Sequence, residues 1–226
     1  MPRSSPAGPG RGASALLVPT LRKQSALFMV GSALFAVGSA PGLSTALGPQ
    51  LGNLAFFIGA WWFTAAGFVQ LAMSGPPRGR TADGRVALRS EWAAAAVQSV
   101  GTLLFNVSTT AALSATTLLA ERHLVWRPDA GGSLAFLVSA GFACAAYRSA
   151  HATLWDPRRG EWWSTVVNLA GCVAFAVSAI GAFIESDGDP LSSPAVDWGT
   201  CLGAVCFFVA SWIVLPRRRA ATHRVP

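Results

Sequence analysis

The sequence predicts an all-α membrane protein with six transmembrane helices, and three observations support this class. Charged residues make up only 12% of the 226 residues and apolar residues 52%, whereas an ordinary soluble domain has about 25% charged residues. Six stretches are long and apolar enough to cross a hydrocarbon core, which takes about 20 residues. A short pattern of glycine and phenylalanine recurs along these stretches. The apolar content disfavours a disordered chain, and the four cysteines do not predict a disulfide scaffold.

The expected spans are separated by polar connections and flanked by two tails. Residues 1–23 are rich in proline, glycine, serine and arginine, and we expect them to form a disordered cytoplasmic segment. Residues 216–226 form a basic cytoplasmic tail. In chain order, the six spans cover residues 25–43, 53–73, 92–119, 133–154, 162–184 and 196–215.

Charged and aromatic residues bound these spans. The first span begins after Arg22 and Lys23, and every Asp, Glu and Lys lies outside the spans or at their margins. Arg148 lies about one turn from the end of the fourth span, where its side chain can extend to the interface. Tryptophan is typical of both membrane interfaces. The tryptophans near expected helix ends are Trp92, Trp155, Trp162, Trp163 and Trp198.

The basic residues predict the orientation in the membrane. Fifteen of the 17 lysines and arginines fall on one side of the expected spans, and only Arg122 and Arg127 fall on the other. Because cytoplasmic connections carry an excess of Lys and Arg, we expect both termini in the cytoplasm, below a bacterial-type inner membrane. The net charge is then +11 inside and −4 outside. Topology and contact with anionic lipid explain this basic balance better than nucleic-acid binding does.

The first span can also be interpreted as a cleaved signal peptide. Arg22 and Lys23 precede an apolar run that ends in Val37-Gly-Ser-Ala40, which resembles a small-residue cleavage site. Cleavage there would leave Pro41 as the first residue, and the run belongs to the repeat described next. We therefore expect this span to be retained.

The glycine and phenylalanine pattern divides the chain into three two-helix units, at residues 24–75, 92–154 and 162–215. In the first helix of each unit, a glycine is followed four residues later by a phenylalanine, and the units are 70 residues apart. A similar pair recurs in each second helix. Residues four apart share a helix face, and small residues let membrane helices approach closely. The expected packing residues are Gly31, Phe35, Gly52, Phe56, Gly101, Phe105, Gly132, Phe136, Gly171, Phe175, Gly203 and Phe207.

Since each unit has two helices, the three units have the same orientation. We expect a pseudo-threefold bundle of three parallel hairpins, with a side-by-side row as the alternative. The segment 28–39, followed by 53–59, resembles the YrhK-like membrane family over about fifty residues. The resemblance implies a two-helix unit and no catalytic residue, because that family has no established activity. The later units depart from it, with Ser108 and Ser178 where the first has Gly38.

Polar side chains within membrane helices are the usual functional markers. Gln98 and Asn168 occupy equivalent positions, while Asn106 occurs only in the middle unit. Together with Thr109, these residues could line an axial polar site in a bundle. The alternative is hydrogen bonding between helices, worth about 0.6 kcal/mol for each pair. No Asp, Glu, His or Lys is expected at mid-membrane depth, which disfavours ion-coupled transport.

No motif predicts catalysis, a metal site or a cofactor. The histidines His123, His151 and His223 are far apart in the sequence. The external turn with Glu185, Asp187 and Asp189 could attract a divalent cation, but it lacks the spacing of a calcium-binding loop. The cysteines are typical of small apolar residues, because they fall within expected helices and form no CxxC motif. They are Cys144, Cys172, Cys201 and Cys206.

An aromatic and basic cluster ends the fourth span, and it could hold an anionic lipid head group or simply anchor the helix at the interface. The cluster consists of Tyr147, Arg148, His151, Trp155, Arg158 and Arg159. We expect a non-enzymatic accessory or structural component that contacts the lipid bilayer and another membrane protein or a second copy of itself. The alternative function is a small uncoupled channel or facilitator for a small polar solute at the axial site.

Overall fold

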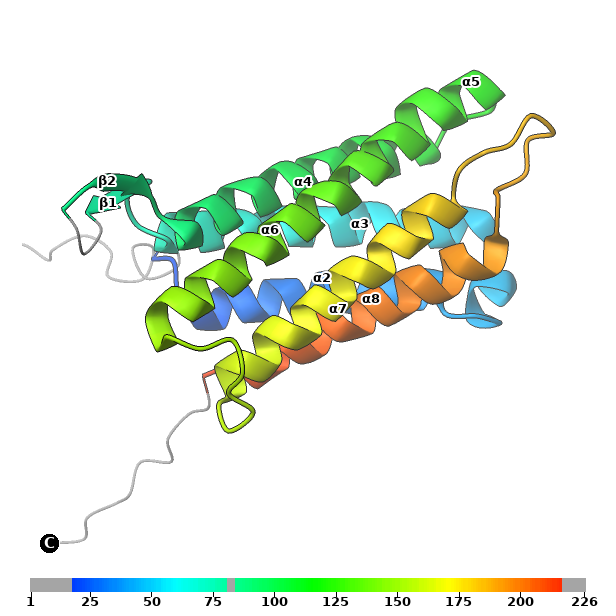
Figure 1. Ribbon diagram of the computed structural model, residues 1–226. Coiled ribbons are helices and arrows are strands. Elements are labelled where there is room, and N and C mark those ends of the chain that lie inside the picture. Colours follow the sequence, from blue (N-terminus) through cyan, green and yellow to red (C-terminus); the bar gives the residue numbers. More distant parts are fainter. Residues whose placement is uncertain (1–17, 81–83, 217–226) are drawn as a thin grey trace, which may run out of the picture.

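The long helices lie side by side, with their axes roughly along one direction (Figure 1). The computed structural model describes residues 18–80 and 84–216, so most of the two expected tails falls outside the described residues. A short α5 (Leu118–Ala120) and a π-helix, η1 (Glu121–Trp126), precede α6, and the strands β1 (Arg78–Arg80) and β2 (Val86–Leu88) form an antiparallel pair. The long helices are α2 (Leu21–Ser39), α3 (Leu43–Met73), α4 (Ser90–Ala112), α6 (Arg127–His151), α7 (Gly160–Gly181) and α8 (Ser193–Ile213).

The predicted helical class is confirmed. Within the described residues, four helical segments are long and apolar enough to cross a membrane: α3, the continuous stretch Leu118–His151, α7 and α8. The helices α2 and α4 are not among them. The first turn of α2 contains Arg22 and Lys23, and α4 carries polar side chains such as Gln98 and Asn106. The chain thus has the character of a membrane protein, while the count of six spans stays a prediction.

Several boundaries differ from the sequence prediction. The helix α3 begins ten residues before the expected start at residue 53, with a kink at Gly48, whose φ of 78° is left-handed, and Pro49. The expected third span ends early, at Ala112, because residues 113–117 turn and the Thr117 hydroxyl accepts a hydrogen bond from the Ala120 amide. The chain is then helical from Leu118 to His151. The helical stretch that contains the expected fourth span therefore begins fifteen residues before the predicted start at residue 133.

The helices form a closed ring. Each of α2, α3, α4, α6, α7 and α8 packs against the next in this order, and α8 packs back against α2. The long helices therefore form a closed bundle and not the alternative row, while the threefold repeat stays a prediction. The described chain ends, the β1–β2 pair and the α6–α7 connection lie at one end of the ring, whereas α5 and the α7–α8 connection lie at the other (Figure 1).

Glycines bring neighbouring helices together at three positions. A methyl group added to Gly31 would lie 3.0 Å from the Gly59 carbonyl oxygen, and one added to Gly101 would lie 3.1 Å from that of Gly132. A methyl group on Gly203 would lie 3.0 Å from the Gly171 carbonyl oxygen. These distances leave no room for a larger side chain.

In α3 the residues at this crossing are not those expected from the repeat. Gly59 faces Gly31, and Phe63 is the buried ring, whereas Gly52 and Phe56 lie two turns earlier and pack near Gly38. The pattern occurs twice in α3, seven residues apart, so both copies present it on nearly the same helix face. Both copies therefore pack against α2, the expected Gly52 and Phe56 near Gly38 and the additional Gly59 and Phe63 at the crossing with Gly31.

Phenylalanine rings fill the centre of the ring of helices. Neighbouring ring centroids are separated by 5.1 to 6.4 Å, which is the range of favourable aromatic pairs. The other expected phenylalanines take part in this cluster, to which Phe28 also belongs. Its buried members are Phe28, Phe35, Phe63, Phe105, Phe136, Phe175 and Phe207.

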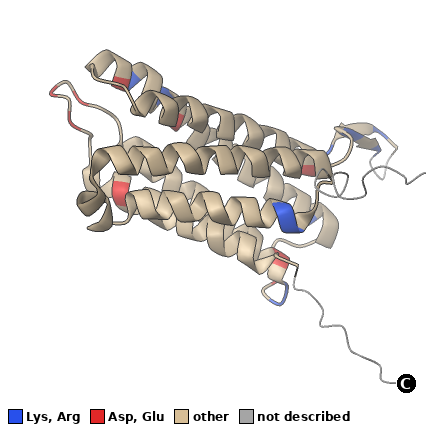
Figure 2. Ribbon diagram, turned by 180° about the vertical axis from the view of Figure 1, so that it is seen from behind, with Lys and Arg blue, Asp and Glu red and all other residues tan. Residues whose placement is uncertain are grey.

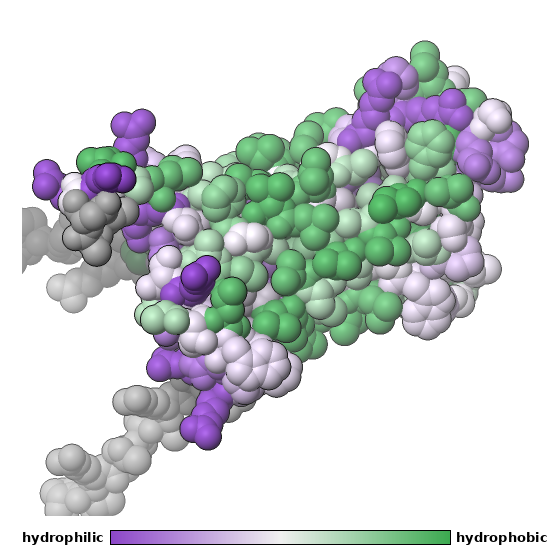
Figure 3. Space-filling model, viewed as in Figure 1, coloured by the Kyte–Doolittle hydropathy of each residue, from purple (hydrophilic) through white to green (hydrophobic). Residues whose placement is uncertain are grey.

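The described charges gather at the two ends, and an apolar band lies between them (Figures 2 and 3). We call these the basic end and the acidic end. The basic end carries Arg22, Lys23, Arg78, Arg80, Arg85, Arg89, Arg148, Arg158 and Arg159. The acidic end carries Glu121, Asp129, Glu185, Asp187, Asp189 and Asp197.

Candidate functional site

A cavity of about 380 Å³ opens between the helices at the acidic end. Residues from all six long helices, from η1 and from the α7–α8 connection line this acidic-end cavity. Its volume lies near the lower limit of small-molecule pockets, which span about 300–1,000 Å³. The closed ring thus surrounds a space of the size that a small ligand requires.

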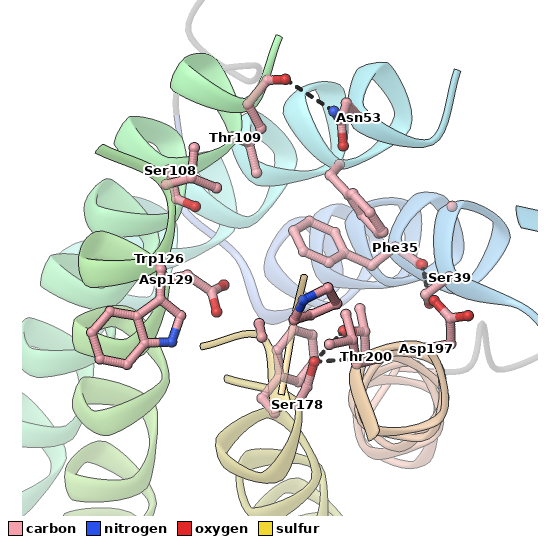
Figure 4. A pocket seen from close by; sticks show the side chains of 18 of the residues that line it. Phe35, Ser39, Asn53, Ser108, Thr109, Trp126, Asp129, Ser178, Asp197 and Thr200 are labelled. Atoms are coloured by element: carbon pink, nitrogen blue, oxygen red, sulfur yellow. Dashed lines mark hydrogen bonds between the residues drawn. The ribbon is translucent and has the colours of Figure 1, made fainter. Parts of the chain in front are cut away.

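Three carboxylates line the acidic-end cavity, from three different elements. Glu121 comes from η1, Asp129 from α6 and Asp197 from α8, and each is partly exposed. Asp129 points from α6 toward the space between the helices (Figure 4). Among the described residues none of the three forms an ion pair or a side-chain hydrogen bond. No cationic side chain of the described residues therefore pairs with these three carboxylates.

The two arginines near these carboxylates in the sequence have other partners. The Arg122 Nε donates to the Ile184 carbonyl oxygen over 2.8 Å, and its guanidinium lies 5.7 Å from the Phe183 ring centroid. The Arg127 guanidinium lies 3.1 Å from the His123 Nδ1 on the exposed side of the helix. Neither arginine lines the cavity.

The π-helix η1 positions one wall of the cavity. π-Helical turns are rare and occur frequently at functional sites. The Trp126 indole Nε1 donates to the Ala179 carbonyl oxygen over 2.8 Å, which fixes η1 against α7. The Trp126 ring also packs edge-on against Phe183, with centroids 5.0 Å apart. Glu121, Trp126 and Asp129 therefore come from one rigid helical segment.

Hydroxyl groups also line the cavity. Ser39 donates to the Phe35 carbonyl oxygen over 2.6 Å, and Thr109 donates to that of Phe105 over 2.8 Å. The hydroxyls of Ser178 and Thr200 lie 2.7 Å apart, between α7 and α8 (Figure 4). Because each hydroxyl has two lone pairs, those that donate to the backbone can still accept a hydrogen bond.

The four predicted axial residues do not form one site. Thr109 lines the acidic-end cavity, while Gln98 and Asn168 line a second cavity of about 160 Å³. Asn106 lines neither of the two cavities, because it is buried and its Nδ2 donates to the Thr64 hydroxyl over 2.8 Å between α3 and α4. The expected single axial site was wrong, and for Asn106 the alternative of a hydrogen bond between helices describes the structure.

The second cavity lies on the other side of the phenylalanine cluster, and we call it the amide cavity. It brings together Gln24, Gln70, Gln98 and Asn168 with several hydroxyl groups. The Gln98 Oε1 accepts a hydrogen bond from Ser139 over 3.3 Å, whereas the buried Gln70 Oε1 has no partner within the described residues. The phenylalanines that line it belong to the central cluster.

Two members of the predicted lipid head-group cluster pair with neighbouring acidic residues. Arg159 pairs with Asp156 at 2.7 Å, and the His151 Nε2 lies 3.5 Å from the Glu161 carboxylate. The side chain of Trp155 is exposed. Arg148 and Arg158 are also exposed, and among residues 18–80 and 84–216 they form no ion pair.

The acidic turn and the cysteines do not form an organised site within the described residues. The acidic turn is held by a hydrogen bond from the Asp189 amide to the Asp187 carboxylate. In the described ranges no three His, Cys, Asp or Glu residues group closely enough to hold a metal ion. Cys172 is buried, and Cys144, Cys201 and Cys206 are partly buried, as small apolar residues are.

The three cavity carboxylates were missed as a site because the sequence interpretation placed Asp129 in a loop. The expected fourth span started at residue 133, which left Asp129 in the connection before it. In the structure Pro128 lies in the first turn of α6, directly after η1. Proline is tolerated in a first turn because its missing N–H is not needed there. No family model, curated protein or solved structure matches this chain.

Proposed function

We propose that this chain is a non-enzymatic membrane component that binds a small solute in the acidic-end cavity. The observation that carries the proposal is a 380 Å³ space lined by all six long helices and by carboxylates that have no partner in the described part of the chain. Carboxylates that line a cavity and have no protein partner are left to interact with water or with a ligand that the cavity receives.

We place this component in a bacterial-type inner membrane with six spans and both termini in the cytoplasm. The four long apolar helical segments support a membrane location, and the basic end fits the positive-inside rule. The acidic-end cavity then opens to the outside. Three tandem hairpins, of which the first is akin to YrhK-like domains, fit the three glycine crossings. An accessory role would add a membrane partner or a second copy, with anionic lipid at the basic end.

Blocking the mouth of the cavity tests the proposal. Ser193 is exposed and lines the rim, whereas Leu191 is exposed in the same segment and does not line it. We expect at least one solute from a panel of small cations, anions, zwitterions and neutral polar compounds to raise the Tm of the protein in nanodiscs. Saturation near 100 times Kd is worth about 2.7 kcal/mol, or roughly 5–10 °C for a domain of this size.

The Ser193→Trp variant should lose this shift and the Leu191→Trp variant should keep it. A panel in which no solute separates Ser193→Trp from the wild type would contradict a functional acidic-end cavity.

An uncoupled facilitator is the second candidate, and the amide cavity favours it. The acidic-end cavity and the amide cavity are lined by members of the same phenylalanine cluster, so movement of a few rings would join them. Flux of the bound solute into proteoliposomes, reduced several-fold by Gln98→Leu, is the expected result for a facilitator. Binding without flux above that of protein-free liposomes would exclude this candidate.

A further inference from the structure

The charge of the acidic-end cavity restricts the class of solute, and this inference rests on the proposed function. Its lining contains Glu121, Asp129 and Asp197, and it contains no Lys, Arg or His from the described residues. The nearby Arg122 contacts the α7–α8 connection, and Arg127 contacts His123. A low-dielectric cleft lined by one sign of charge concentrates ions of the opposite sign. The solute is therefore expected to be a cation.

The lining groups lie at different depths, and their chemistry indicates what each end of the bound cation contacts. Asp197 lies in the first turn and a half of α8, and Thr200 lies about one turn deeper. The rings of Phe35 and Phe175 lie deeper still and belong to the central cluster. Asp197 thus lies toward the mouth, and the aromatic rings form the floor. This arrangement fits a ligand with a charged head and a hydrocarbon body.

Several features favour an ammonium group as the head. The carboxylates come from two walls, Glu121 and Asp129 from the continuous helical stretch Leu118–His151 and Asp197 from α8. The Trp126 and Phe56 rings lie in the walls of the same cavity. Aromatic faces attract organic cations by cation–π interaction, and a mixed wall of rings and single carboxylates suits a group that is partly apolar. The hydroxyls of Ser178 and Thr200 can accept additional N–H donors.

The cavity volume sets the size of the ligand. At about 30 Å³ for each water-sized group, 380 Å³ holds on the order of ten non-hydrogen atoms. We propose that the acidic-end cavity binds a small organic ammonium ion, whose charged head lies between Asp129 and Asp197 and whose hydrocarbon body lies against Phe35 and Phe175.

Calorimetric titration of the full chain in nanodiscs tests this assignment with three probes of matched shape. They are phenethylammonium, the neutral 2-phenylethanol and the anion phenylacetate, with Ca²⁺ as a fourth, inorganic probe. We expect phenethylammonium alone to bind. Asp129→Asn, which keeps the shape and removes the charge, should weaken binding at least tenfold. The matched control, Asp187→Asn, removes a carboxylate from the exposed turn outside the cavity and should leave the Kd unchanged.

The outcomes separate this inference from the proposed function. Should Asp129→Asn fail to fold, Asp197→Asn provides the same comparison from α8. Equal affinity for phenethylammonium and 2-phenylethanol, an unchanged Kd in both carboxylate variants, or binding of Ca²⁺ alone would overturn the inference. If another solute in the panel binds in a Ser193→Trp-sensitive way while phenethylammonium does not, the inference fails and the proposed function stands. If no solute binds, both fail.

Discussion

Single glycines determine how closely the helices of this bundle approach. At Gly101 an added methyl group would lie 2.6 Å from Phe136 Cδ1 and 3.1 Å from the Gly132 carbonyl oxygen. At Gly141, on α6, an added methyl group would meet no atom within 4 Å. Both glycines are helical, so the difference between them is one of packing and not of backbone conformation.

The two glycines therefore predict opposite effects of the same substitution. Gly101→Ala should lower the free energy of unfolding by about 1–3 kcal/mol, because inserting a methylene-sized group into a packed interface forces rings and backbone to move. Gly141→Ala should be neutral or stabilising by up to about 1 kcal/mol, since alanine favours the helix. Reversible unfolding in mixed micelles measures both, and equal destabilisation by the two variants would show that the glycine crossing is not tightly packed.

At this scale the sequence predicted most of the packing residues but not the cavity. A glycine and a phenylalanine four residues apart lie on the same helix face, so their spacing alone predicts that they pack together. Gly59 and Phe63 escaped this prediction because α3 holds two copies of the pattern, and only the tertiary contact with Gly31 distinguishes them. Asn106 could not be assigned to a cavity or an interface without knowing that Thr64 lies opposite.

Among the elements, η1 and the connection between α7 and α8 form the rim of the cavity together. The connection is a short hairpin-like loop in which Ile184 pairs with Pro190 and the Leu191 amide donates to the Phe183 carbonyl oxygen. The Arg122 guanidinium reaches it from η1. The Arg122 hydrogen bond thus adds to the Trp126–Phe183 ring contact in linking the two elements that border the opening.

Removal of this link should loosen the loop while leaving the helices intact. The hydrogen bonds of a charged donor contribute about 1.5–3 kcal/mol, so Arg122→Ala should accelerate hydrogen exchange at the Glu185 and Leu191 amides about tenfold or more. Arg127→Ala is the control. Arg127 is exposed, and within the described residues its side chain forms a hydrogen bond with His123 alone. Similar exchange in both variants would mean that Arg122 does not hold the rim.

Element boundaries were the least predictable feature, and the reasons are local. Residues 113–117 are ordinary small and polar residues whose turn depends on the Thr117 cap. A proline at residue 128 and charges at 121, 122, 127 and 129 are typical of a loop. The helix persists through them because η1 widens one turn and Trp126 is held against α7. The β1–β2 pair was not expected, since three-residue strands leave no pattern.

For the whole molecule, the separation of charge between the basic and acidic ends is the feature that the sequence predicted best. Charges avoid the apolar band for the same physical reason whichever helices cross the membrane, so their positions along the chain suffice. Closure of the ring was harder to predict from the sequence, because a row of hairpins would have the same local sequence pattern. Only the packing of α8 against α2 distinguishes the two arrangements.

The orientation can be measured with single cysteines in a variant whose four native cysteines are replaced. Position 187 lies on the exposed turn at the acidic end, and position 87 lies in exposed β2 at the basic end. A membrane-impermeant maleimide added to intact cells should modify Asp187→Cys, whereas Ala87→Cys should react only after the cells are permeabilised. The reverse pattern would overturn the orientation, and with it the exposure of the cavity to the outside.

Closure of the ring also has a consequence for biosynthesis. The helix α2 ends at Ser39, but its second neighbour, α8, begins only at Ser193. At about 5–20 residues per second, the ribosome needs roughly 8–30 s to make the intervening chain. During that interval, the faces of α2 and α7 that later receive α8 have no protein partner. A ribosome that stalls in this window would leave a ring that lacks the helix joining α7 to α2.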